Sequence, residues 1–123
     1  MTAWLKHLPQ TIAESEVDLL AGDTLPSVWV DRWMRDPQRE VIHDPKQGWI
    51  NGGTLLARSQ IAARKLARAG VAAGDRVLIS ASSSVDLVVA HTAALRLGAI
   101  VMPTNGAYRA DEVAHVVSDA RPR

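Results

Sequence analysis

The chain has 123 residues, of which 47% are hydrophobic and 22% are charged, a balance that is typical of one globular domain and excludes wholesale disorder. The formal net charge of +1 gives no reason to expect nucleic acid or an acidic membrane surface as a partner. The absence of cysteine excludes disulfides, thiol nucleophiles and zinc–thiolate sites.

Charge is distributed unevenly along the chain. Residues 1–53 hold five Lys/Arg and eight Asp/Glu, whereas residues 54–123 hold nine and five, and this asymmetry favours contact between the two segments without defining a binding face. The N-terminus lacks the long apolar core of a signal peptide, and no stretch approaches the roughly 18 apolar residues that a membrane span needs. We therefore expect a cytoplasmic location and no membrane span.

Residues 1–23 are interpreted as an N-terminal extension with few structural signals. Their apolar residues hint at short helical pieces interrupted by Pro9, and Gly22-Asp23 indicates a turn. The main domain is expected over residues 24–123, and it opens with a short helix from Ser27 through Met34.

Ser27 can cap that helix, and Asp36-Pro37 should end it because the residue before proline is pushed out of the helical region. Trp29 and Trp33 stand four residues apart. Tryptophans at this spacing are more often core packing than a ligand platform, and we favour the core.

A small hairpin is predicted next, from strands at residues 41–43 and 49–50 joined by a loop over 44–48. Asn51-Gly52-Gly53 is interpreted as a flexible connection, and Thr54 as the cap of the following helix.

That helix is predicted over residues 54–69, with apolar residues on one side. The predicted apolar face comprises Leu55, Ala62, Leu66 and Ala69. Arg64 and Arg68 lie opposite, and we interpret them as a solvated face rather than as a nucleic-acid site. Gly70 follows where a left-handed cap is needed.

Residues 70–105 carry the clearest pattern: a tight turn, a strand at 77–80, a helix over 85–97 and a second strand before Pro103. The strands are continuous apolar runs, typical of strands covered on both faces, and the connection implies parallel pairing with a right-handed crossover. The predicted fold class is α/β, an incomplete parallel βαβ unit preceded by a small α/β-hairpin segment.

The crossover helix is apolar around most of its circumference, which predicts burial. Ser83 or Ser84 can cap it, and Ser83 with Asp86 resembles a capping box. A further helix is predicted over residues 111–118. Because two strands bury too little of such an apolar helix, we expect another strand soon after Pro122, so the chain reads as unfinished.

Few residues are candidates for chemistry. The loop at residues 81–84 joins a strand end to a helix N-terminus, where anions can bind, but we favour a helix cap there; a dinucleotide site is not expected, because no G-x-G-x-x-G follows the strand. The histidines lack metal-ligand spacing, and His91 is interpreted as an interior residue. The four are His7, His43, His91 and His115.

Two features near the C-terminal helix also have an alternative reading. Asp111-Glu112 is a pair of carboxylates, better interpreted as charge near a helix N-terminus than as an acid–base pair. Tyr108 is interpreted as lining a loop rather than as facing a pocket in a larger protein.

An ordered set of short motifs resembles the adenylate-forming enzymes, the superfamily of acyl-CoA synthetases, luciferases and peptide-synthetase adenylation domains. The set is Gly70-Val71-x-x-Gly74-Asp75-Arg76-Val77, Leu97-Gly98-Ala99, Pro103-x-Asn105 and Asp111-Glu112. The resemblance covers about residues 24–123 and implies that they begin the large AMP-binding domain. Residues 105–109 look most like acyl-CoA ligases for small acids, of the fatty-acyl-CoA or malonyl-CoA synthetase type.

Some positions depart from the family pattern. Ser83 stands where relatives commonly have Asn, Gly106 stands where many have a second proline, and Leu55 replaces the usual aromatic after Thr54. Serine can cap a helix as asparagine does, so the first departure changes little.

The resemblance implies ATP, Mg²⁺ and coenzyme A as cofactors of a complete enzyme that activates a carboxylic acid as its adenylate and passes the acyl group to a thiol. The family's phosphate loop, metal-binding acid, ribose-binding Asp and late catalytic Lys have no counterpart here. No catalytic, cofactor-binding or metal residue is therefore assigned, and no cofactor is expected for this chain alone. Two hypotheses remain: part of a carboxylate–CoA ligase, inactive in isolation, or a stand-alone interaction or dimerisation module derived from that fold.

Overall fold

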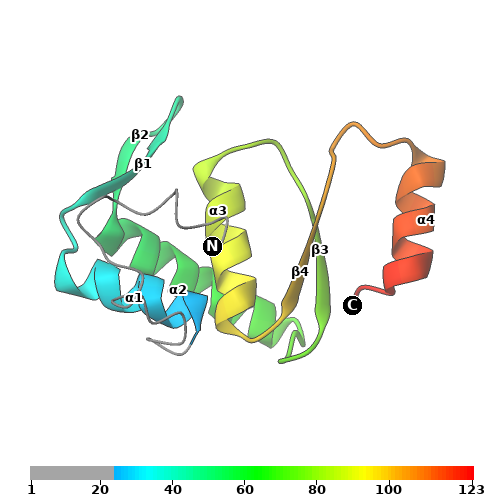
Figure 1. Ribbon diagram of the computed structural model, residues 1–123, viewed down its shortest axis with the longest axis horizontal. Helices are drawn as coiled ribbons and strands as arrows, with labels where there is room; N and C mark the ends of the chain where they lie inside the picture. Colours follow the sequence, from blue (N-terminus) through cyan, green and yellow to red (C-terminus); the bar gives the residue numbers. More distant parts are fainter. Residues whose placement is uncertain (1–23) are drawn as a thin grey trace, which may run out of the picture.

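The computed structural model describes residues 24–123 (Figure 1), and the expectations for residues 1–23, including Pro9 and Gly22-Asp23, lie outside that range. Four helices and four strands follow one another along the described part. They are α1 (Leu25–Arg35), β1 (Glu40–Asp44), β2 (Gly48–Asn51), α2 (Gly52–Arg68), β3 (Arg76–Ser80), α3 (Val85–Arg96), β4 (Ile100–Thr104) and α4 (Ala110–Ala120).

Two separate two-stranded sheets confirm the predicted fold class. β1 and β2 form an antiparallel hairpin, whereas β3 and β4 pair in parallel from Arg76 opposite Ile100 to Ser80 opposite Thr104. α3 connects the two parallel strands, as a βαβ unit requires. The turns before β3 also follow the prediction, because Gly70 and Gly74 have φ of 97° and 84°, values that favour glycine.

The core lies where α1, α2 and α3 meet the hairpin. Trp33, the buried member of the tryptophan pair, belongs to this core, and Trp29 packs against it with ring centroids 6.5 Å apart. The prediction that the pair serves packing is confirmed. The other fully buried members of the cluster are Ile50, Leu55 and Val85.

The first helix begins earlier than predicted. Its cap is Thr24, whose Oγ1 accepts a hydrogen bond from the Ser27 amide at 3.3 Å, so the prediction of a Ser27 cap is wrong. Pro26 lies in the first turn, where a missing N–H costs no intrahelical bond. The predicted end holds, since Asp36 is the C-cap.

The start of α2 also corrects the prediction. Asn51 is the N-cap, accepting from the Thr54 amide at 2.9 Å, so Thr54 is not the cap and residues 51–53 are not a flexible connection. The amides of Gly52 and Gly53 donate to carbonyls of residues 39 and 37 at 3.0 and 2.8 Å. Glycine is needed at 52 because a Cβ there would come within 3.0 Å of the Trp33 ring.

The buried face of α2 is rotated from the predicted one. Leu55 is buried as expected, but Ser59 and Ala63 complete the face, while Ala69 is exposed. Ser59 can be buried because its hydroxyl donates to the Leu56 carbonyl at 3.1 Å and accepts from Arg96 Nη1 at 2.9 Å. A polar residue on a packing face was not anticipated because its partner lies on α3.

The parallel strands are less covered than predicted. No residue of β3 or β4 is fully buried, and Ile100 remains 52% exposed. α3 packs on one side of these strands, and α4 stands on the other side in Figure 1, without a buried residue of its own. In the described part of the chain, the expectation of strands buried on both faces is wrong, because the outer face lacks a full layer.

Within residues 24–123, no helix combines the length and the apolar character needed to span a membrane.

Candidate functional site

The carboxyl ends of β3 and β4 lie at the same edge of the sheet, with Ser80 opposite Thr104. Ligands of open α/β sheets bind at such edges. A hollow of about 620 Å³ opens there between the loop after β3 and the loop after β4. Its lining is short and mostly polar: Ser80, Ala81, Ser82, Ser83, Thr104, Asn105 and Gly106. We call this hollow the carboxyl-edge pocket.

Two polar side chains at this edge of the sheet already serve the backbone. Ser84 is the N-cap of α3, and its Oγ accepts from the Leu87 amide at 3.3 Å. Asn105 Oδ1 accepts from the Ala107 amide at 3.0 Å and holds the turn that follows β4. Thr104 Oγ1 is buried and has no hydrogen-bond partner within residues 24–123.

The N-terminus of α3 is met by a carboxylate from the hairpin. Asp44, only 5% exposed, accepts a hydrogen bond on Oδ2 from the Val85 amide at 2.9 Å. Its other oxygen, Oδ1, accepts from the amides of Lys46 and Gln47 at 2.8 and 3.0 Å. The bond from Val85, and then the bonds within the hairpin loop and the charge of Lys46, hold the pKa of Asp44 below its ordinary value despite burial.

This carboxylate decides between the two interpretations of the loop at residues 81–84. A helix N-terminus attracts anions through its free amides and its dipole, but here Asp44 occupies the first helical amide and Asp86 adds a second negative charge in the first turn. A further anion would meet both charges. The favoured helix-cap interpretation is therefore supported, with Ser84 rather than Ser83 as the cap, so the Ser83–Asp86 capping box is wrong.

Sequence reasoning had not singled out Asp44. Its loop carried a local signal, because Asp followed by Pro and, three residues later, Gly is typical of a turn that the Asp side chain closes. Nothing local pointed to Val85, which lies 41 residues further along the chain.

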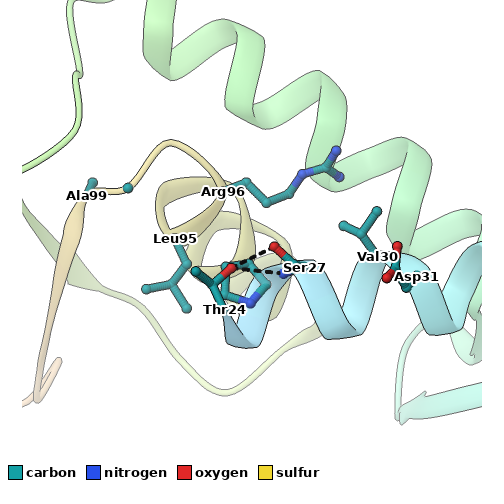
Figure 2. A pocket seen from close by; sticks show the side chains of 9 residues that line it. Thr24, Ser27, Val30, Asp31, Leu95, Arg96 and Ala99 are labelled. Atoms are coloured by element: carbon teal, nitrogen blue, oxygen red, sulfur yellow. Dashed lines mark hydrogen bonds between the residues drawn. The ribbon is translucent and has the colours of Figure 1, made fainter. Parts of the chain in front are cut away.

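A second hollow, of about 590 Å³, lies between the start of α1 and the end of α3. Figure 2 shows Thr24 and Ser27 bonded to each other at its rim, with Arg96 leading away toward α2. Arg96 Nη1 donates to Ser59 Oγ at 2.9 Å and to the Leu56 carbonyl at 3.4 Å, and burial lowers the pKa of this guanidinium. Because the one basic group at this hollow is already used in packing, we assign it no ligand.

The histidines do not form a metal site in the part of the chain that the structure describes. His43 is exposed and packs edge-on against Trp49, with the two ring centroids 5.2 Å apart. No cluster of three or more potential metal ligands occurs within residues 24–123. His91 is half-buried on α3 rather than fully interior. His7 lies outside the described residues.

The residues near α4 take the structural roles that were favoured. Glu112 accepts from the Arg109 amide at 2.7 Å, so this carboxylate caps the start of α4. Tyr108 is 43% exposed and borders a hollow of about 390 Å³ with Asp111 and His115. Nothing in this geometry links Tyr108 to an acyl group.

Comparison with known proteins identifies relatives along nearly all of the described part. A family model described as "AMP-binding enzyme" matches residues 29–123. The salicyl-AMP ligase / salicyl-S-ArCP synthetase of Mycobacterium tuberculosis is 34% identical over 99 residues, covering 77% of this chain and 18% of that protein.

Solved structures match as well. The N-terminal subdomain of Klebsiella oxytoca NpsA is 26% identical with a TM-score of 0.73, covering 80% of this chain and 26% of that one. A structure from Rhodopseudomonas palustris, named as a long-chain-fatty-acid CoA ligase, is 31% identical with a TM-score of 0.75. The match covers 84% of this chain and 26% of that one. The chain spans less than a fifth of the curated relatives it matches.

Proposed function

Because this chain belongs to the family of AMP-binding enzymes, we propose that it forms the N-terminal part of the large domain of an ATP-dependent carboxylate ligase. The observation that carries the proposal is the match of residues 29–123 to the family model. Residues 24–123 would begin the AMP-binding domain, and residues 1–23 would precede it as an extension. In this role the βαβ unit supplies one wall of the active-site cleft.

The complete enzyme would catalyse two half-reactions. A carboxylate oxygen of the substrate attacks the α-phosphorus of Mg²⁺-bound ATP, the bond to the leaving phosphate breaks, and pyrophosphate departs. A thiol then attacks the acyl carbon of the adenylate, forming a thioester and releasing AMP. ATP and Mg²⁺ belong to the first step, and the thiol to the second.

Coenzyme A is our proposed thiol. Residues 105–109 resemble ligases for small carboxylic acids, and similarity to a protein named as a long-chain-fatty-acid CoA ligase supports the same acceptor. A carrier protein is the competing acceptor, supported by similarity to a salicyl-S-ArCP synthetase. The acid itself would be a fatty acid or a small acid of the malonyl type.

The 123-residue chain should not catalyse either half-reaction alone. Residues 82–84 are its one run of consecutive serines, and that run lacks the glycines and the lysine with which such enzymes hold the phosphates of ATP. The N-terminus of α3 that follows this run is already bonded to the Asp44 carboxylate, which disfavours phosphate there.

ATP–pyrophosphate exchange tests this assignment directly. The purified 123-residue chain, given Mg-ATP and a panel of carboxylic acids, should show no exchange above a protein-free blank. The native protein, captured from its source cells with an antibody to residues 54–123, should exchange with at least one acid and be heavier than 13.3 kDa. Robust exchange by the isolated chain would contradict the proposed role.

A stand-alone interaction or dimerisation module is the second candidate. The incompletely covered faces of β3 and β4, together with Trp49 at 58% exposure, favour it, since exposed apolar surface drives association. A native species of 13.3 kDa with no exchange activity would support this candidate instead.

A further inference from the structure

Asp44 is the one acidic side chain that is fully buried within residues 24–123. Burying a carboxylate is costly unless hydrogen bonds replace its hydration. Here three backbone amides do so, and they come from two different places: Lys46 and Gln47 in the hairpin loop, and Val85 at the start of α3. Oδ1 accepts from the two loop amides, and Oδ2 accepts from the amide at the start of α3.

We propose that Asp44 is a positioning residue for the carboxyl-edge pocket: its carboxylate takes the place of a bound anion at the N-terminus of α3 and locks the loop at residues 81–84 to the hairpin. One oxygen shapes the hairpin loop and the other fixes where α3 begins. Since β3 ends four residues before Ser84, fixing α3 also fixes the loop that lines the pocket.

The chemical consequence is selectivity by charge. The first amide of α3 already donates to Asp44, so this helix end disfavours a further anion such as phosphate. This inference rests on the proposed function only in treating the edge as part of an active-site wall. The test measures how well backbone amides are protected from hydrogen exchange. Failure of pyrophosphate exchange and failure of the link that Asp44 makes between the hairpin and α3 (the Asp44 link) therefore give different results.

Hydrogen exchange of the full 123-residue chain tests the Asp44 link. It is measured by mass spectrometry on peptides covering residues 44–48 and 84–88. The folded pKa of Asp44 lies below its ordinary value of 3.8, so the bonds persist above pH 3.8 and weaken as the pH falls through the folded value. Both peptides should lose protection together, with one midpoint below 3.8, while a peptide from residues 60–68 stays protected.

Asp44→Asn supplies the matched variant. An amide side chain offers one acceptor and one donor, so it cannot accept from both the loop and Val85. Protection of the Val85 amide should fall by about tenfold or more at neutral pH, as expected for loss of a charge-assisted hydrogen bond, and the low-pH transition should vanish.

Asp75→Asn is the control, because Asp75 also accepts a loop amide, from Ala72 at 2.8 Å, but does not contact the hairpin. It should leave both peptides unchanged. If Asp44→Asn fails to fold, the pH series on the unmodified chain still tests whether one carboxylate bonds both the hairpin loop and α3. Of the other charged groups nearby, His43, Lys46 and Asp86 are exposed and Arg58 is half-buried.

Two results would overturn the inference. The first is separate midpoints for the two peptides, which would mean that one carboxylate does not serve both. The second is a gain in protection of residues 84–88 when inorganic phosphate is added to the unmodified chain, which would mean that the helix end is open to anions.

Discussion

Gly52 shows how a single missing side chain permits the packing of α1 on α2. A Cβ at this position would lie 3.0 Å from Trp33 Cδ1 and 3.2 Å from Trp33 Cα, and Trp33 is buried in the core. The backbone of α1 at Trp33 cannot move away from an added Cβ as easily as the end of a flexible side chain could. Close approach, and not backbone conformation, is therefore the reason for glycine here.

Gly52→Ala should destabilise the chain by about 1–3 kcal/mol, as overpacking in a core does, although Gly→Ala in a helix ordinarily stabilises by about 1 kcal/mol. Urea unfolding followed by tryptophan fluorescence measures the difference. Gln60→Ala, an exposed change on the same helix, is the control and should alter stability by less than about 0.5 kcal/mol. A stabilised Gly52→Ala variant would refute the packing argument.

At the scale of the elements, α2 and α3 are joined by a polar contact inside an otherwise apolar interface. Arg96 reaches from α3 to the buried hydroxyl of Ser59 on α2. The hydroxyl also donates to its own helix at Leu56, so the donor and acceptor capacities of Ser59 are both used. The contact fixes how the two helices face each other.

Arg96→Met should lower the free energy of unfolding by about 1–2 kcal/mol, because it keeps the length of the side chain but removes hydrogen bonds from a charged donor. A double-mutant cycle with Ser59→Ala should show coupling between the two positions. Arg64→Met, on the exposed side of α2, should be nearly neutral. Additive effects of Arg96→Met and Ser59→Ala would mean that the contact contributes nothing.

For the molecule as a whole, the apolar surface of the described part is incompletely covered. Ile100 and Trp49 are each more than half exposed, and α4 touches β3 mainly through its end, where Arg76 Nη1 donates to the Ala120 carbonyl at 3.0 Å. Exposed apolar surface of this kind favours association between copies.

Sedimentation of the isolated chain should therefore show species larger than the 13.3 kDa monomer. Ile100→Glu should shift the distribution toward monomer, because a charge on the exposed sheet opposes burial, whereas Gln60→Glu should not. A single monomeric species with a cooperative thermal transition would count against an exposed interface.

Local sequence patterns were enough to predict the order of elements in residues 24–123. The hairpin, the βαβ unit and the turns at Gly70 and Gly74 each depend on neighbours a few residues apart, and alternation, apolar runs and glycine report such relations directly. The same patterns favoured a cap for the loop at residues 81–84, although they left open which serine provides it.

What only the tertiary structure decided depends on partners that are distant in sequence. Ser59 is buried because Arg96, 37 residues further along the chain, donates a hydrogen bond to its hydroxyl. The start of α3 is fixed by Asp44, which lies 41 residues before Val85. Polar residues can be buried only where a partner replaces water. The partner is set by how the helices and the hairpin pack, so no local pattern in the chain could identify it.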